Sequence, residues 1–124
     1  MWNYVAVALG GVVGCCARYG VTQWVQLYYG RSFPLATLII NVLGCLAMGF
    51  LFFATLERVS VSPALRMALL TGVLGGFTTF STFAMEALLL AEDGEAGYAV
   101  LYVLLSVFLG LAAALLGAWL ARSL

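Results

Sequence analysis

Residues 72–83 of this chain read Gly72-Val73-Leu74-Gly75-Gly76-Phe77-Thr78-Thr79-Phe80-Ser81-Thr82-Phe83, in the middle of a long apolar stretch. Glycine, β-branched threonine and aromatic residues are all poor helix formers, and glycine costs up to about 1 kcal/mol relative to alanine. The run therefore predicts a break in a helix, which we place at Gly75-Gly76. In lipid, the backbone groups that a break frees must be satisfied by protein, water or an ion. Broken helices therefore occur where they line a cavity or bind a ligand.

The chain around this run is too apolar for a soluble domain. Of its 124 residues 65% are hydrophobic, and only five basic and five acidic residues carry charge. A helix needs about 20 mostly apolar residues to cross a hydrocarbon layer roughly 30 Å thick. Four stretches meet that requirement. We therefore expect an all-α membrane protein with four transmembrane helices, in a single four-span domain over residues 1–124, with spans at about residues 4–27, 35–56, 64–91 and 98–120.

Charge at the ends of the spans sets their orientation only weakly. Four spans return the chain to its starting side, so Arg58, Arg66 and Arg122 share one membrane face with the N-terminus. Arg31 and an acidic loop, Glu92-Asp93-Gly94-Glu95, lie at the other face. An excess of arginine marks the cytoplasmic side, which favours both termini in the cytoplasm. Because the excess is small, insertion in both orientations stays open, and with it an assembly of oppositely oriented copies.

Small residues recur at the spacing by which membrane helices pack. Small residues four apart let two helix backbones approach closely in lipid. Helix packing alone explains most of these small residues. Because four helices enclose little interior, we also expect a homo-oligomer. The residues are Gly10 and Gly14, Gly72 and Gly76, and Gly110, Ala114 and Gly117.

The hydroxyl and aromatic residues of the 72–83 run are the first candidates for a site. An isolated serine or threonine in a membrane helix often bonds to a carbonyl of the preceding turn. Four hydroxyls beside a glycine pair and three aromatic residues favour a polar path instead, because polar groups are costly in lipid. Phe80 and Phe83 lie three residues apart, so on a helix they share a face and can present their positive ring edges to an anion. Ordinary core packing is the alternative for this pair.

Further polar residues lie inside the other spans and beyond the run. Asn41 is suited either to donate hydrogens to an ion or to bond to a neighbouring helix. Arg18 must face a water-filled vestibule or a partner, and Glu86 needs a partner or water, with an arginine as its simplest partner. Tyr102 and Ser106 are one turn apart and can continue the polar face, although tyrosine also suits a membrane interface.

The chain lacks the residues that several functional classes require. Histidine is absent and the net charge is zero, so nothing supports histidine-based metal or proton chemistry or nucleic-acid binding. Cys15, Cys16 and Cys45 lack metal-ligand spacing and are interpreted as packing residues. No nucleophile–base or metal constellation points to an enzyme.

Two other kinds of membrane protein are the alternatives. A small proton-coupled exporter of cationic compounds also has four spans, similar length and dual topology. It needs a titratable carboxylate deep in its substrate path, and Glu86, beyond the polar run, is the only one available. A non-transporting assembly subunit would explain the glycine faces but not the cluster of threonine, serine and phenylalanine.

The same residues resemble the Fluc (CrcB) family of fluoride channels. The resemblance covers essentially the whole chain, through Gly11-Val12-Val13-Gly14 leading to Arg18, through Asn41-Val42-Leu43-Gly44, and above all through residues 72–83. It implies a channel, not an enzyme, that exports fluoride passively and sits in the bacterial inner membrane. It also implies an antiparallel, dual-topology homodimer with two pores.

The resemblance further implies roles for individual residues. Asn41, Phe80 and Phe83 match the pore residues that meet fluoride, and Arg18 matches an arginine near the aqueous entrance. Gly75 and Thr78 match positions whose backbone carbonyls, taken from both copies, hold a structural sodium ion at the dimer centre. The remaining candidates, which would form a polar track, are Ser81, Thr82, Tyr102 and Ser106.

Overall fold

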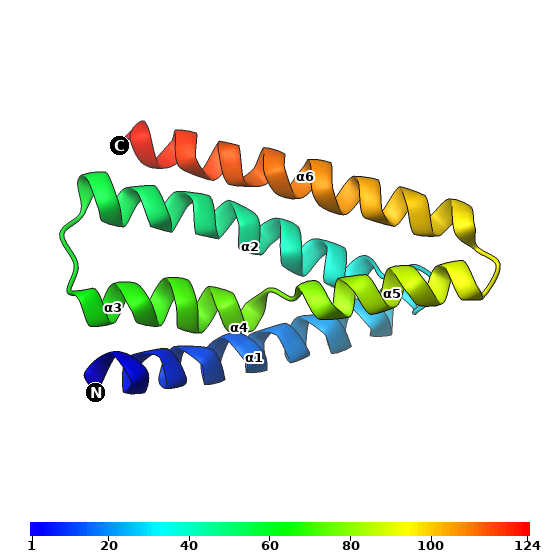
Figure 1. Cartoon of the computed structure of the whole chain (residues 1–124), viewed down its shortest axis with the longest axis horizontal. Coiled ribbons are helices and arrows are strands. Elements are labelled where there is room, and N and C mark those ends of the chain that lie inside the picture. Colours follow the sequence, from blue (N-terminus) through cyan, green and yellow to red (C-terminus); the bar gives the residue numbers. More distant parts are fainter.

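The structure, a computed structural model, describes residues 1–124 as helices joined by short turns (Figure 1). The first span is α1 (Trp2–Tyr29), and the second is α2 (Leu35–Phe53) with a π-helical end, η1 (Ala54–Arg58). The third span has four parts: α3 (Pro63–Met67), the π-helical η2 (Ala68–Leu74), α4 (Gly75–Phe77) and α5 (Phe80–Glu92). The fourth span is α6 (Ala96–Arg122).

These helices form four stretches that are long and apolar enough to cross a membrane: Trp2–Tyr29, Leu35–Arg58, Pro63–Glu92 and Ala96–Arg122. Each predicted span falls inside one of them, so the expected all-α, four-span membrane protein is confirmed. The chain ends, together with the turn between α2 and α3, lie at one end of the bundle (Figure 1). The turns from α1 to α2 and from α5 to α6 lie at the other.

Local signals in the sequence explain where the helices begin and end. Ser62 caps α3, because its hydroxyl accepts a hydrogen bond from the amide of Leu65 at 3.2 Å, and Pro63 occupies the first helical position. Gly30 and Gly94 follow α1 and α5 with positive φ values of 76° and 82°, a conformation that glycine adopts without steric cost.

The small residues pack helix against helix, as the sequence predicts. A Cβ atom on Gly10 would collide with the carbonyl oxygen of Ala68, and one on Gly72 would lie 2.8 Å from that of Val7. These glycines press α1 onto the first half of the third span. Gly117 does the same for α6, where a Cβ would collide with the carbonyl of Leu46 in α2. The packing interpretation is therefore confirmed for these positions.

The break in the third span lies at Thr78-Thr79, and the prediction that it lies at Gly75-Gly76 is wrong. Both glycines are helical, whereas Thr78 has a ψ of 158° and Thr79 has φ and ψ of −153° and 122°. Gly76 serves close packing instead, because a Cβ there would lie 2.8 Å from the carbonyl oxygen of Gly11. Threonine tolerates extended backbone, and the Thr79 hydroxyl caps α5 by accepting from the amide of Thr82 at 3.3 Å.

Beyond the break the third span changes its neighbours. α1 packs against α3, η2 and α4, while α5 packs against α6 and touches α2. A small core forms there from Leu38, Leu90, Ala99 and Tyr102. The change of neighbour separates α5 from α1.

Candidate functional site

Asn41 joins α2 to the break in the third span. Its Nδ2 donates to the carbonyl of Thr79 at 2.9 Å, and its Oδ1 accepts from the amide of Thr79, also at 2.9 Å. Of the two interpretations of Asn41, the bond to a neighbouring helix is therefore present. One of the two Nδ2 hydrogens remains for another acceptor.

The break deprives the carbonyls of Gly75 and Thr78 of their helical donors. In an unbroken helix the amides of Thr79 and Thr82 would donate to the carbonyls of Gly75 and Thr78. Instead, the Thr79 amide donates to Asn41 and the Thr82 amide donates to the Thr79 hydroxyl. Gly75 is also exposed on the surface of the single chain. The two carbonyls predicted to hold sodium are therefore free of these intrahelical hydrogen bonds.

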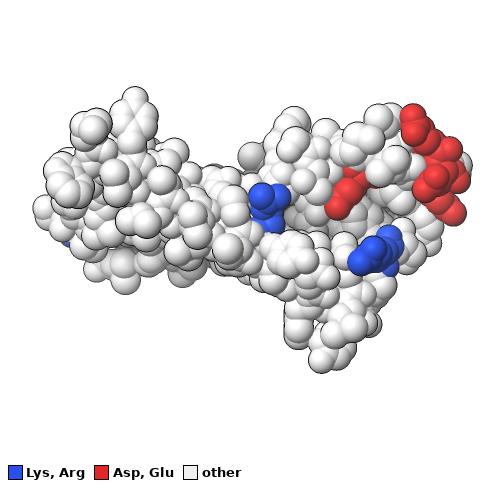
Figure 2. Space-filling view, turned by 90° about the horizontal axis from the view of Figure 1, so that it is seen from below, with Lys and Arg blue, Asp and Glu red and all other residues white.

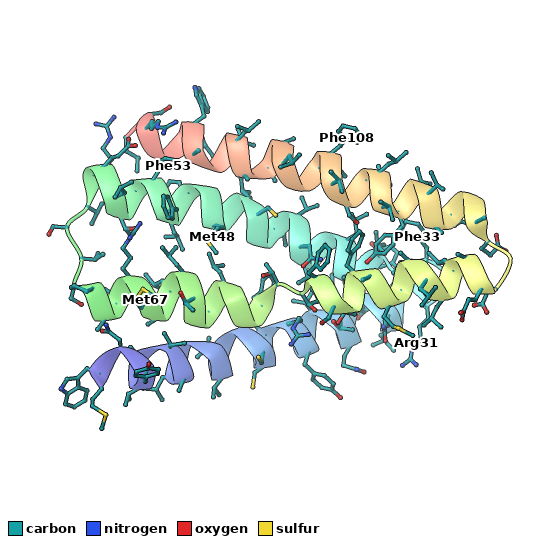
Figure 3. The ribbon with its side chains drawn as sticks, viewed as in Figure 1. Arg31, Phe33, Met48, Phe53, Met67 and Phe108 are labelled. Carbon is teal, nitrogen blue, oxygen red and sulfur yellow. The ribbon has the colours of Figure 1, made fainter.

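A cavity of about 330 Å³, here called the central cavity, lies beside the break. No charged side chain lines it. The Ser106 hydroxyl is buried and has no hydrogen-bond partner, whereas the Phe80 side chain is 79% exposed, with its ring centroid 5.5 Å from that of Phe83. Met48 points from α2 towards the third span (Figure 3). The lining residues are Asn41, Gly44, Cys45, Met48, Thr78, Thr79, Phe80, Phe83, Ser106 and Val107.

A second cavity of about 240 Å³, the inner vestibule, lies on the other side of Thr79, which lines both cavities. Arg18 lines this vestibule, and its Nε donates to the carbonyl of Gly76 at 3.0 Å. Thr82, another predicted site residue, lines it too. Its full lining is Cys15, Arg18, Tyr19, Thr22, Thr37, Ile40, Thr79, Thr82 and Glu86.

Glu86 is satisfied by two hydroxyl groups rather than by an arginine. Thr37 Oγ1 donates to one carboxylate oxygen at 2.9 Å, and the Tyr102 hydroxyl donates to the other at 2.7 Å. The one ion pair in the chain joins Arg122 to Glu57, at 3.5 Å. The prediction that an arginine is the simplest partner of Glu86 is therefore wrong. A pair of hydroxyl donors supports a carboxylate inside a span without a second charge.

Tyr102 and Ser81, like Gly75, line neither of these two cavities. Tyr102 is fully buried, and its ring centroid is 5.2 Å from that of Phe83. It therefore contacts the site through Phe83 and Glu86. Ser81 is exposed, with its hydroxyl oxygen 3.5 Å from that of Thr79. The predicted residues thus divide between the central cavity, the inner vestibule and their margins.

Sequence reasoning missed two threonines with defined roles in this arrangement. Thr79 caps α5 and bonds Asn41, and Thr37 donates to Glu86. A signal was present for Thr37, because it precedes Asn41 by one turn of α2 and so shares its face. No comparable signal distinguished Thr79 from the neighbouring hydroxyls.

Comparison with known proteins places the chain in a family. The family model described as CrcB-like protein, Camphor Resistance (CrcB), matches residues 5–118. The chain belongs to the CrcB family. The matched segment contains every residue that lines the central cavity and the inner vestibule.

Three similar CrcB relatives carry the same curated name, fluoride-specific ion channel FluC. The protein of Acidithiobacillus ferrooxidans is 59% identical over 117 residues, which cover 94% of each chain. That of Stutzerimonas stutzeri is 48% identical, again over 94% of each chain. That of Roseiflexus sp. (strain RS-1) is 43% identical over 122 residues and 98% of each chain.

Proposed function

We propose that this chain is a fluoride-selective channel that lets fluoride leave the cytoplasm passively, and that the central cavity is part of the fluoride path. The observation that carries the proposal is the uncharged, donor-bearing cavity at the helix break. It contains the unpartnered Ser106 hydroxyl, one free hydrogen of Asn41 and the rings of Phe80 and Phe83. The FluC names of relatives at up to 59% identity support the same function.

The chemistry of fluoride explains why such a cavity suits it. Fluoride is small and strongly hydrated, so a pore must replace its water with strong donors. Hydroxyl and amide hydrogens do so directly, and the positive edges of aromatic rings add weaker attraction. Because the cavity lacks a fixed cation, the ion is not held too tightly to leave.

The hydrogen bonding of Glu86 argues for passive conduction and against a proton-coupled exporter of cationic compounds. Such an exporter needs a carboxylate that is free to exchange its proton for substrate. Both carboxylate oxygens of Glu86 already accept hydrogen bonds, from Thr37 and Tyr102.

The path that we propose runs through the inner vestibule and reaches the central cavity past Thr79. The positive charge of Arg18 attracts the anion there, and Thr82 also lines this vestibule. Ser81 is a candidate contact on the exposed side of the break. Tyr102 is a positioning residue in this proposal, because its contacts are with Glu86 and Phe83.

The functional unit that we propose is an antiparallel homodimer with two pores. In a single chain Phe80 is 79% exposed near the middle of the third span, so one wall of the central cavity is incomplete. A second copy would complete that wall. The small arginine bias between the two ends of the chain permits both orientations.

We further propose that a structural sodium ion lies where the two copies meet. The residues present fit such an ion, because Gly75 and Thr78 each carry a carbonyl that the break has released from the helical ladder. Carbonyl oxygens can replace the water around a small cation, and two copies would supply two pairs of them. The bound ion would hold the two broken helices together.

Growth of bacteria that lack their own fluoride exporter tests the function. We expect the chain to restore growth in medium containing fluoride, and we expect Phe80→Ile to abolish the protection because an aliphatic side chain has no positive ring edge. Phe108→Ile is the matched control, since Phe108 is 66% exposed on α6 and lines neither cavity. Failure of the unaltered chain to protect, at normal expression in the membrane, would contradict the proposal.

A further inference from the structure

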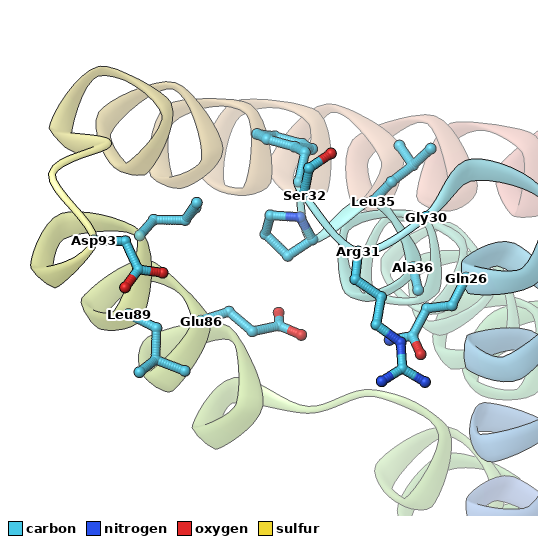
Figure 4. Close-up of a pocket in the computed structure, with 12 residues that line it drawn as sticks. Gln26, Gly30, Arg31, Ser32, Leu35, Ala36, Glu86, Leu89 and Asp93 are labelled. Atoms are coloured by element: carbon cyan, nitrogen blue, oxygen red, sulfur yellow. The ribbon is translucent and has the colours of Figure 1, made fainter.

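A third cavity lies beyond the inner vestibule, towards the loops at one end of the bundle. This outer cavity has a volume of about 220 Å³ and lies between the end of α1, the turn before α2, and α5 (Figure 4). Glu86 lines both the outer cavity and the inner vestibule, just as Thr79 lines both the inner vestibule and the central cavity. The outer cavity, the inner vestibule and the central cavity therefore follow one another from the loops to Phe80 and Phe83.

The charges around the outer cavity are unfavourable to an anion except at one residue. Glu86 and Asp93 line it, and the turn that contains Asp93 also carries Glu92 and Glu95. Apart from Glu57, the acidic side chains gather at this end of the molecule (Figure 2). Arg31 is the one cationic residue in the lining, and Figure 4 shows it on the side of the cavity opposite Glu86.

Arg31 also differs from the other arginines in having no partner within the chain. Arg122 pairs with Glu57, and Arg58 donates to the carbonyl of Arg122 at 2.7 Å. Arg18 donates to Gly76, and Arg66 donates to the Thr55 hydroxyl. The positive charge of Arg31 is therefore exposed at the cavity and unneutralised.

We infer that the outer cavity is the mouth of the fluoride path and that Arg31 recruits the anion there against the surrounding carboxylates. The inference rests on the proposed function and adds to it a residue that sets how often fluoride enters. A charge at the mouth of a charged cleft raises the local concentration of its counter-ion and the rate of association. Such attraction acts through water, so it weakens as salt shortens the Debye length.

Fluoride efflux from liposomes that contain the purified protein tests this role. At low ionic strength we expect Arg31→Gln to slow the initial efflux by about three- to tenfold, because the mouth then carries only carboxylates. Arg31→Lys keeps the charge and should keep most of the flux. Raising an impermeant salt to about 1 M, where the Debye length is roughly 3 Å, should bring Arg31→Gln close to the unaltered chain.

Arg58→Gln is the matched control, because it also removes one arginine at a membrane boundary but lines none of the three cavities. Asp93→Asn should act in the opposite sense to Arg31→Gln and speed efflux at low ionic strength. Unaltered efflux in Arg31→Gln, or a defect that persists in high salt, would overturn the role of Arg31 alone. Absence of fluoride efflux from the unaltered chain would overturn the proposed function as well.

Discussion

At the scale of single residues, the side-chain amide of Asn41 acts as a substitute for the missing helical hydrogen bonds. It bonds both the amide and the carbonyl of Thr79, each at 2.9 Å. Inside a membrane, these backbone groups have few other partners. Asn41 thus keeps the break open while leaving one hydrogen for the central cavity.

Asn41→Asp tests this double role. A carboxylate can still accept from the Thr79 amide, but it cannot donate to the Thr79 carbonyl, and a buried hydrogen-bond partner left unsatisfied costs about 1–3 kcal/mol. We expect a lower midpoint of thermal unfolding in detergent together with loss of fluoride efflux. Asn3→Asp, at an exposed position of α1, should change neither measurement. A fully stable and fully conducting Asn41→Asp variant would show that the paired hydrogen bonds between Asn41 and Thr79 are dispensable.

Single residues also show how far the sequence alone reaches. Asn41, Phe80, Phe83 and Ser106 were chosen from sequence, and the structure brings them to one cavity. Thr79 was not singled out, because its cap and its bonds to Asn41 depend on how α2 meets the third span. The partners of Glu86 are tertiary contacts from two different helices, and no local pattern predicts them.

At the scale of elements, the glycines of the third span allow close helix packing, and its threonines form the break. Gly72 and Gly76 lie on the face that meets α1, where a Cβ would come within 2.8 Å of a backbone carbonyl. Thr78 and Thr79 take the extended conformation. Helix propensity correctly predicted that this span breaks but placed the break on the wrong pair. Close helix packing keeps glycine helical despite its propensity.

The π-helical segments are a second feature that sequence reasoning did not predict. η1 ends the second span at Arg58, and η2 lies in the third span where α1 crosses it. Wider π turns have no composition signal of their own and often mark functional sites. Here η2 is followed by α4 and then by the break at Thr78-Thr79.

Substitution of matched glycines tests the packing of α1 on the third span. A methyl group on Gly10 meets the backbone of Ala68, whereas nothing lies within 4 Å of one on Gly20. We expect Gly10→Ala to destabilise the protein by about 1–3 kcal/mol through overpacking. Gly20→Ala should be neutral or stabilise it by up to about 1 kcal/mol through helix propensity. Equal unfolding midpoints for the two variants, measured in the same detergent, would argue against this close contact.

At the scale of the whole molecule, a single chain leaves its site unfinished. Phe80 is exposed, the Gly75 and Thr78 carbonyls have lost their helical donors, and the central cavity is open beside them. All three features lie at the break, near the middle of the third span. A partner that meets this region would complete them together, which is why we propose a dimer.

Tandem fusions of two copies test the antiparallel arrangement. A linker with one added transmembrane helix places the second copy upside down, whereas a short polar linker leaves both copies in the same orientation because each has four spans. We expect fluoride efflux only from the fusion with the added helix. Conduction by the fusion with the short linker, with no dimers formed between fusions, would mean that parallel copies suffice.

Fluoride selectivity is tested most simply by the efflux of anions from liposomes that contain the purified, unaltered chain. With an ion-selective electrode outside the vesicles, we expect rapid release of fluoride and chloride release no faster than from empty vesicles. Only small anions that accept strong hydrogen bonds should gain enough from Ser106, Asn41 and the ring edges to shed their water. Absence of fluoride release, or release of chloride at the same rate, would show that the chain is not a fluoride-selective channel.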